Sequence, residues 1–166
     1  WNSFSLSSNG KNITLHTPGE ILVDNRNSQW KWIPSLRADA GLVLLQDNGT
    51  PSNPNDDHVT YRRNWTDQTG RTITPSEIRA IAQDSNHTIW VGTSSGIFAI
   101  PHSVDFTLSN QCIRIIIPRN DGSGLGDYLL ENEQINAIAI DGANRLWVGT
   151  TNSGIFLLNP IGDVNN

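Results

Sequence analysis

Few side chains in this 166-residue sequence could do chemistry, and their spacing favours no reaction. Cys112, the only cysteine, lies in the apolar stretch QCIRIIIP without a His or Asn context that would mark a nucleophile, so we interpret it as a small buried residue. The four histidines show no spacing typical of metal ligands and are expected at the surface or in turns: His16, His58, His87 and His102. The sequence therefore predicts neither a cysteine enzyme nor a histidine-ligated metal.

Two loops carry groups that could hold an ion. Asp47, Asp56 and Asp57 of QDNGTPSNPNDDH could supply oxygens to Ca²⁺, but the dense D-x-D-x-D-G spacing is missing, and a solvated hairpin loop is the simpler interpretation. The glycine-rich NDGSGLGD opens no helix and lacks G-x-G-x-x-G, which argues against a phosphate site. We expect no cofactor, with calcium near the three aspartates left open.

Composition excludes some partners. The net charge of −5 gives no basic surface for nucleic acid. The longest apolar run, around Ile115 to Ile117, is too short to cross a bilayer. Because the chain starts at Trp1 and contains no Met, we expect it to be a processed chain or a piece of a longer polypeptide.

Hydrophobic periodicity predicts an all-β protein. No stretch repeats apolar residues at helical spacing, whereas short runs rich in Val, Ile, Trp and Thr alternate with Gly, Asn, Asp and Pro. The expected strands are Asn12–Thr17, Gly19–Asp24, Gln29–Pro34, Gly41–Gln46, His58–Thr66, Ile78–Asp84, Thr88–Thr93, Ile97–Pro101, Cys112–Arg119, Ile135–Asp141, Arg145–Thr150 and Ile155–Leu158.

The sequence repeats itself. IRAIAQD, which begins at Ile78, recurs as INAIAID 57 residues later, and Trp90 recurs as Trp147 at the same spacing. A third, more divergent copy is expected upstream, with Trp32 in the place of Trp90 and Trp30 as the alternative. Units of this length suit four-stranded propeller blades.

Residue sizes within the repeat agree with a propeller. Blades converge near the axis, where four alanines fit: Ala80, Ala82, Ala137 and Ala139. One strand farther out, Trp90 and Trp147 would fill the widening gap between blades, while Gly92 and Gly149 allow close backbone approach. We therefore expect both tryptophans to be largely buried between sheets, as core wedges and not as a platform for sugars.

The loops at one end of the blades are the candidate ligand-facing surface. Arg79 and Asn136 occupy the same repeat position beside the axis and are the strongest candidates, with an ordinary solvated polar rim as the alternative. A propeller enzyme would need converging acidic or histidine side chains and a metal around the axis, where Ala and Ile stand instead. The complete candidate set is Glu77, Arg79, Ser94, Ser95, Glu133, Asn136, Thr151 and Asn152.

The pattern I-x-x-I-x-x-D-x-x-x-x-x-W-V-G-T-x-x-G-I-F, which begins at Ile78 and recurs with one insertion at Ile135, resembles the two-component-regulator propeller repeat. That repeat is common in periplasmic sensor regions of bacterial hybrid histidine kinases. The segments KWIP, LLQDNGTPSNPNDD, RNDGSGLGDYLL and INAIAIDGANRLWVGT together resemble the PorZ-like propeller proteins of type IX secretion.

The repeat predicts a partial β-propeller with about three four-stranded antiparallel blades, at approximately 1–73, 77–128 and an incomplete 134–166. The resemblances imply a non-enzymatic protein of the bacterial surface or periplasm that holds partner proteins or lipopolysaccharide. A glycan-sensing propeller of a hybrid histidine kinase is the alternative. An open arc of blades would expose apolar faces and strand edges, so we expect self-association.

Overall fold

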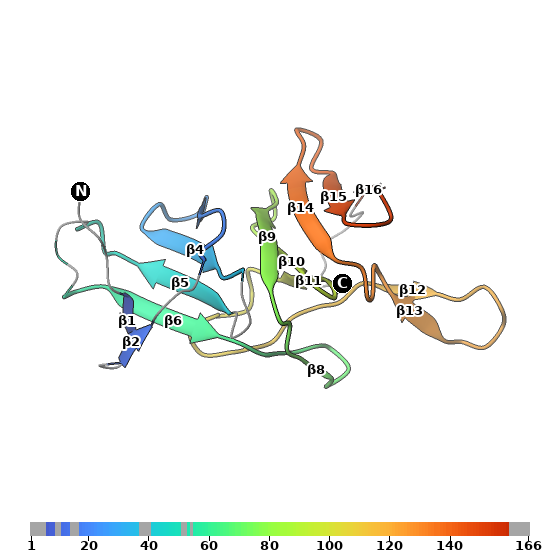
Figure 1. Cartoon of the computed structure of the whole chain (residues 1–166), viewed down its shortest axis with the longest axis horizontal. Helices are drawn as coiled ribbons and strands as arrows, with labels where there is room; N and C mark the ends of the chain where they lie inside the picture. Colours follow the sequence, from blue (N-terminus) through green and yellow to red (C-terminus); the bar gives the residue numbers. More distant parts are fainter. Residues whose placement is uncertain are drawn as a thin grey trace.

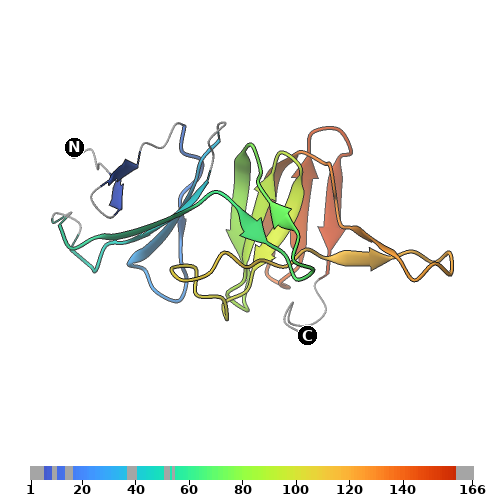
Figure 2. The same ribbon diagram turned by 90° about the horizontal axis from the view of Figure 1, so that it is seen from below.

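The computed structural model describes residues 6–8, 11–13, 17–36, 41–50, 53 and 55–159, and within these every regular element is a strand. Three antiparallel sheets stand side by side, as Figures 1 and 2 show. This arrangement confirms the all-β propeller class. No helix that could span a membrane is found in this part of the chain.

Each sheet is built from strands that are consecutive in the sequence. The first sheet contains β3 (Leu22–Val23), β4 (Trp30–Pro34), β5 (Leu42–Gln46) and β6 (His58–Arg62). The second contains β9 (Ile78–Gln83), β10 (Ile89–Thr93) and β11 (Gly96–Ile100), and the third β14 (Ile135–Ile140), β15 (Leu146–Thr150) and β16 (Ile155–Leu158). Three two-stranded hairpins flank them: β1 (Leu6–Ser8) with β2 (Lys11–Ile13), β7 (Trp65–Thr66) with β8 (Thr72–Ile73), and β12 (Ile116–Pro118) with β13 (Gly126–Tyr128).

The blades differ from the prediction in strand number. Only the first sheet has four strands in the described residues. The second sheet has three because the predicted strand Cys112–Arg119 is divided. Ile113 makes a single bridge to Ala99 at the edge of the second sheet, and the chain then leaves the sheet to form β12, which pairs with β13. The start of a fourth strand is therefore present, but the following residues form a separate hairpin.

Apolar side chains fill both spaces between the sheets. Trp32 and Leu44 of the first sheet share one core cluster with Ile81, Ile89 and Val91 of the second. The opposite face of the second sheet and the third sheet form the other cluster, which contains Trp90, Ile97, Ala99, Ile135, Leu146 and Val148. The second sheet is thus covered on both faces, as expected of an inner blade.

Gly92 allows the second and third sheets to pack closely together. A Cβ atom at this position would lie 2.6 Å from Cγ2 of Ile135 and 3.0 Å from Cδ1 of Ile138, which is closer than side-chain atoms pack. Glycine is therefore required because the β14 side chains rest directly on the β10 backbone.

The same turn and indole bond recur in the blades. Asp84 Oδ1 accepts hydrogen bonds from the backbone nitrogens two and four residues later, both at 2.9 Å, and Asp141 does the same. The other carboxylate oxygen accepts from an indole Nε1 in three sheets: Trp32 to Asp24 at 3.0 Å, Trp90 to Asp84 at 2.9 Å and Trp147 to Asp141 at 3.0 Å. The bond to Asp24 identifies Trp32, and not Trp30, as the repeat equivalent of Trp90.

The predicted burial of the tryptophans is right for Trp90 and wrong for Trp147. Trp90 is 1% exposed between the second and third sheets, whereas Trp147 is 39% exposed. Each of these tryptophans points toward the sheet that follows it, and no sheet follows the third one in the described residues. The third sheet is present, but Trp147 has no following sheet to pack against in the described residues.

Removal of the Asp84 carboxylate is expected to destabilise the second sheet. Asp84 is 3% exposed, so Asp84→Ala would leave the buried Trp90 Nε1 and Thr88 nitrogen without an acceptor. An unsatisfied buried donor costs about 1–3 kcal/mol, and we expect a loss of about 3 kcal/mol in the free energy of unfolding, measured by urea titration. Asp141→Ala, at the equivalent position where the side chain is 23% exposed, is the matched control, and an equal loss there would contradict this account.

Asp24 should make stability fall in acid. Burial raises the pKa of Asp24, but hydrogen bonds from Arg26, Trp32 and Gln83 together outweigh it and hold the pKa well below its usual range. The unfolded carboxyl, with a pKa near 4, takes up a proton first as the pH falls, so stability declines below about pH 4. Urea midpoints from pH 7 to pH 2.5 should show this decline, and it should be weaker in Asp24→Asn.

Candidate ligand-facing surface

Four of the predicted ligand-facing residues form a hydrogen-bond network between the second and third sheets. Arg79 Nε donates to Glu77 Oε2 at 2.7 Å, and Arg79 Nη1 donates to Asn136 Oδ1 at 3.2 Å. Asn136 Nδ2 donates to Thr151 Oγ1 at 2.9 Å. The network lies where β9 and β14 begin, so Arg79 and Asn136 meet as their shared repeat position predicts.

Gln134 completes this network and was missed in the sequence. Its amide fits best with the oxygen toward Arg79, 2.9 Å from Nε and 2.8 Å from Nη2, and the nitrogen 2.8 Å from Thr151 Oγ1. Gln134 stands 57 residues after Glu77, so the repeat could have revealed it. The side chains of Arg79 and Glu77 are 33% and 30% exposed, and a pair this open to solvent adds little to stability.

The side chains of the other predicted residues have other surroundings, although the Ser94 nitrogen donates to the Glu77 carbonyl oxygen at 3.1 Å. Ser153 Oγ donates to Glu133 Oε1 at 2.7 Å, and the hydroxyls of Ser94 and Ser76 are 2.8 Å apart. Ser95 lines a separate cleft, and Asn152 is exposed in the turn between β15 and β16.

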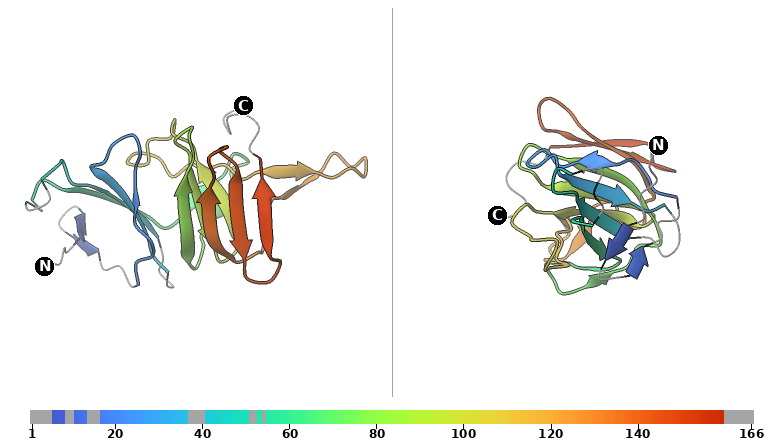
Figure 3. Two further views of the ribbon diagram at one scale, coloured as in Figure 1. Left: turned by 90° about the horizontal axis from the view of Figure 1, so that it is seen from above. Right: turned by 90° about the vertical axis from the view of Figure 1, so that its left-hand side faces the viewer.

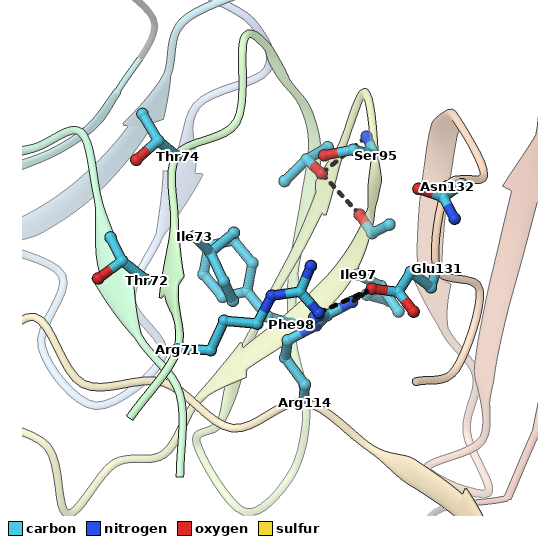
Figure 4. A pocket seen from close by; sticks show the side chains of 12 residues that line it. Arg71, Thr72, Ile73, Thr74, Ser95, Ile97, Phe98, Arg114, Glu131 and Asn132 are labelled. Carbon is cyan, nitrogen blue, oxygen red and sulfur yellow. Dashed lines mark hydrogen bonds and ion pairs between the residues drawn. The ribbon is translucent and has the colours of Figure 1, made fainter. Parts of the chain in front are cut away.

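The cleft that includes Ser95 has a volume of about 180 Å³ and is lined by two arginines (Figure 4). Arg71 Nη1 lies 3.1 Å and Arg114 Nη2 3.3 Å from the same oxygen, Oε1 of Glu131. The Arg114 guanidinium also stacks on Tyr128, with its carbon 3.6 Å from the ring centroid. Sequence reasoning missed this group because its members come from three separate segments and follow no repeat.

The β7–β8 hairpin holds one wall of this cleft. Gln68 Nε2 donates to the Arg114 carbonyl at 2.6 Å, and Gln68 Oε1 accepts from the Arg114 nitrogen at 3.0 Å. The hairpin has the Asp turn of the blades, with Asp67 at its start, but Ile73 stands where the blades have tryptophan. Asp67 Oδ2 consequently has no hydrogen-bond donor among the described residues.

A second cleft, of about 290 Å³, lies between β4, β5 and the loop that follows β11. Trp30 and Arg26 form one side, with the guanidinium carbon 5.5 Å from the indole centroid. His102 and Asp105 contribute polar groups from the loop. Its lining combines the aromatic rings of Trp30, Trp32 and Phe106 with hydrogen-bonding groups.

The residues considered for catalysis or metal binding are either buried or bonded to other side chains. Cys112 is 3% exposed, and burial raises the pKa of its thiol to about 12, so the nucleophilic thiolate is disfavoured. Asp47 pairs with Lys31, and both carboxylate oxygens of Asp56 accept from Thr50 Oγ1.

Burial and the neighbouring carboxylates of Asp56 and Asp47 raise the pKa of Asp57. No group of three or more His, Cys, Asp or Glu side chains suited to a metal occurs among the described residues, a set that excludes His16. Calcium binding near the three aspartates stays a prediction.

Two comparisons with known proteins give matches. The sequence profile of the family described as two component regulator propeller matches residues 72–95 and 129–152. The fold is similar to that of PorZ, an essential surface component of the type IX secretion system of Porphyromonas gingivalis, with a TM-score of 0.76 and 24% identity over 92% of this chain. The chain spans 20% of the length of that structure. No curated protein matches the sequence.

Proposed function

We propose that this chain, which carries two two-component regulator propeller repeats, is a non-catalytic binding or scaffolding region of a bacterial cell-surface or periplasmic protein. Within that class, the proposed role is in type IX secretion, as a PorZ-like component that holds partner proteins or lipopolysaccharide. The observation that carries the proposal is the likeness to PorZ over 92% of the chain, since PorZ is a surface component of that system.

The surface supports binding better than catalysis. Arg79 and Asn136 present hydrogen-bonding groups from two adjacent sheets, and both side chains are held by partners that fix their orientation. Pre-oriented polar groups at the end of a rigid sheet stack favour recognition because little side-chain entropy is lost on binding. The buried Cys112 thiol offers no nucleophile at neutral pH.

The alternative function is glycan sensing in the periplasmic region of a hybrid histidine kinase. The match to the two component regulator propeller family favours it, as does the cleft beside Trp30, because an indole flanked by polar groups suits a sugar ring. Neutral oligosaccharide would then bind at Trp30, away from Arg79.

Ligand binding by the immobilised chain separates the two functions. We expect binding of purified lipopolysaccharide or of solubilised outer-membrane proteins, weakened about tenfold or more by Arg79→Ala, because a lost hydrogen bond to a charged group costs about 1.5–3 kcal/mol. Arg145→Ala, which removes the same charge at the opposite end of the third sheet, is the control. Binding of neutral glycans that is lost in Trp30→Ala and kept in Arg79→Ala would favour the sensor instead.

A further inference from the structure

The cleft between the β7–β8 hairpin and β11 holds more positive charge than its carboxylate balances. Arg71, Arg114 and Glu131 are the ionisable side chains that line it among the described residues, so one positive charge is in excess. The chain as a whole carries a net charge of −5. An anion is therefore attracted to this cleft although the net charge of the protein repels it.

The guanidinium group of Arg114 is buried but poorly satisfied. Arg114 is 7% exposed, and a buried charge normally has a close partner. Its ion-pair partner, Glu131 Oε1, lies 3.3 Å from Nη2, which is longer than the about 2.7–2.9 Å of a charge-assisted hydrogen bond. Arg71 Nη1 lies 3.1 Å from the same oxygen. No other oxygen accepts from the Arg114 guanidinium among the described residues, so most of its N–H donors lack a protein acceptor.

Contacts on the other side of Arg114 fix its orientation. The guanidinium carbon lies 3.6 Å from the centroid of the Tyr128 ring, and Gln68 bonds to the backbone of Arg114 on both its nitrogen and its carbonyl. Stacking uses the flat face of a guanidinium and leaves the N–H groups at its edge available. The structure of the chain in Figure 3 places this cleft near the base of the β12–β13 hairpin, and Figure 4 shows both guanidinium groups directed toward Glu131. These donors are oriented in advance, so little side-chain entropy is lost when an acceptor binds.

The size of the cleft limits what it can hold. Its volume of about 180 Å³ is smaller than the roughly 300–1,000 Å³ of most small-molecule sites. Ile73 and Phe98 contribute apolar surface, and Thr72, Ser95 and Asn132 contribute polar groups. A single side chain or chain end with a short apolar stem and a charged tip fits these dimensions and this lining.

The charge of the cleft favours a carboxylate over a phosphate. A carboxylate carries one negative charge, which matches the one positive charge in excess. A phosphate monoester carries about −1.5 to −2 at pH 7 and would face Glu131 with unbalanced negative charge. A carboxylate can also accept two parallel N–H bonds from one guanidinium group.

We propose that this cleft is a binding site for a carboxylate of a partner protein, supplied by an acidic side chain or by a chain end. The carboxylate accepts hydrogen bonds from Arg114 and Arg71, and Glu131 holds the two guanidinium groups side by side. The site shares no residue with the Arg79 network, so it does not depend on the function proposed above.

Peptide binding to the isotope-labelled chain tests the site, followed by NMR through the side-chain Nε–H signals of Arg71 and Arg114. One probe is acetyl-Gly-Gly-Glu-Gly-Gly-amide, which offers an acidic side chain, and the other is acetyl-pentaglycine with a free carboxyl end. The first peptide with glutamine or phosphoserine in place of glutamate is the comparison. We expect a carboxylate probe to shift the Arg114 signal saturably and to bind about tenfold or more tightly than both comparison peptides. The probe that binds identifies the source of the carboxylate.

Arg71→Gln is the main variant because the Arg71 side chain is 59% exposed, so its replacement should leave the fold intact. It should weaken binding of the carboxylate probe about fivefold or more. Arg119→Gln removes the same charge from the β12–β13 hairpin outside the cleft and is the matched control, with no expected change. Glu131→Gln should strengthen binding about threefold or more, because it removes a competing negative charge and keeps an acceptor for the arginines.

Four results would overturn the proposal. The first is equal affinity for the carboxylate probes and the glutamine peptide, and the second is tighter binding of the phosphoserine peptide, which would make the cleft a phosphate site. The third is equal weakening by Arg71→Gln and Arg119→Gln, which would reduce the effect to overall charge. The fourth is unchanged or weaker binding in Glu131→Gln.

Discussion

Replacement of Trp90 with alanine is expected to lower the free energy of unfolding by about 3–5 kcal/mol, the usual cost of truncating a buried tryptophan. Trp90 is 1% exposed and packs between the second and third sheets, so its removal leaves a cavity and also orphans Asp84 Oδ2. A small domain has about 5–15 kcal/mol of stability in total. The variant should therefore unfold at a much lower urea concentration, monitored by far-UV circular dichroism.

Trp147→Ala provides the comparison at the same repeat position. Its side chain is 39% exposed, so less contact is lost and the cost should be below half that of Trp90→Ala. Equal destabilisation by the two substitutions would mean that Trp147 is covered in solution, for example by a self-associated partner.

Valine at Gly92 is expected to cost about 3 kcal/mol through overpacking. Its Cβ would lie 2.6 Å from Ile135 Cγ2 and 3.0 Å from Cβ of the same residue, so Ile135 or the strand that carries it must shift to make room. Thermal unfolding should show a midpoint lowered by several degrees. A smaller side chain at Ile135 should recover part of the loss, and a Gly92→Val protein as stable as the parent would contradict the close contact between β10 and β14.

The repeat made much of the fold predictable. The spacing of the repeat alone predicted that β9 and β14 are first strands and that Trp90 and Trp147 lie on second strands. It could do so because the same residue types occupy equivalent positions in each blade. The exposure of Trp147 was not predictable in this way, since burial depends on the next sheet and not on the residue itself. Likewise, the division of Cys112–Arg119 arises because Ile116 pairs with Tyr128, a contact set by the hairpin and not by apolar content.

The candidate site was partly predictable for the same reason. Arg79 and Asn136 share a repeat position, and adjacent blades bring equal positions together. The cleft around Arg114 could not be found, because Arg71, Arg114 and Glu131 converge from segments between the blades, where the repeat imposes no register. Sequence periodicity therefore predicts contacts between equivalent positions of the blades, but it does not predict contacts made by the segments that connect them.

The bond between tryptophan and aspartate within one hairpin bears on how the protein folds. Trp90 and Trp147 each follow their aspartate by six residues, so the indole is oriented by contacts between residues that are close in the sequence, and such local contacts favour fast folding. Each hairpin can then orient its indole before the neighbouring blade packs against it, and folding of the chain becomes a succession of steps between neighbouring segments. In such an array the length of the chain sets the number of steps but not their speed, as in other repeat proteins whose units contact only their neighbours.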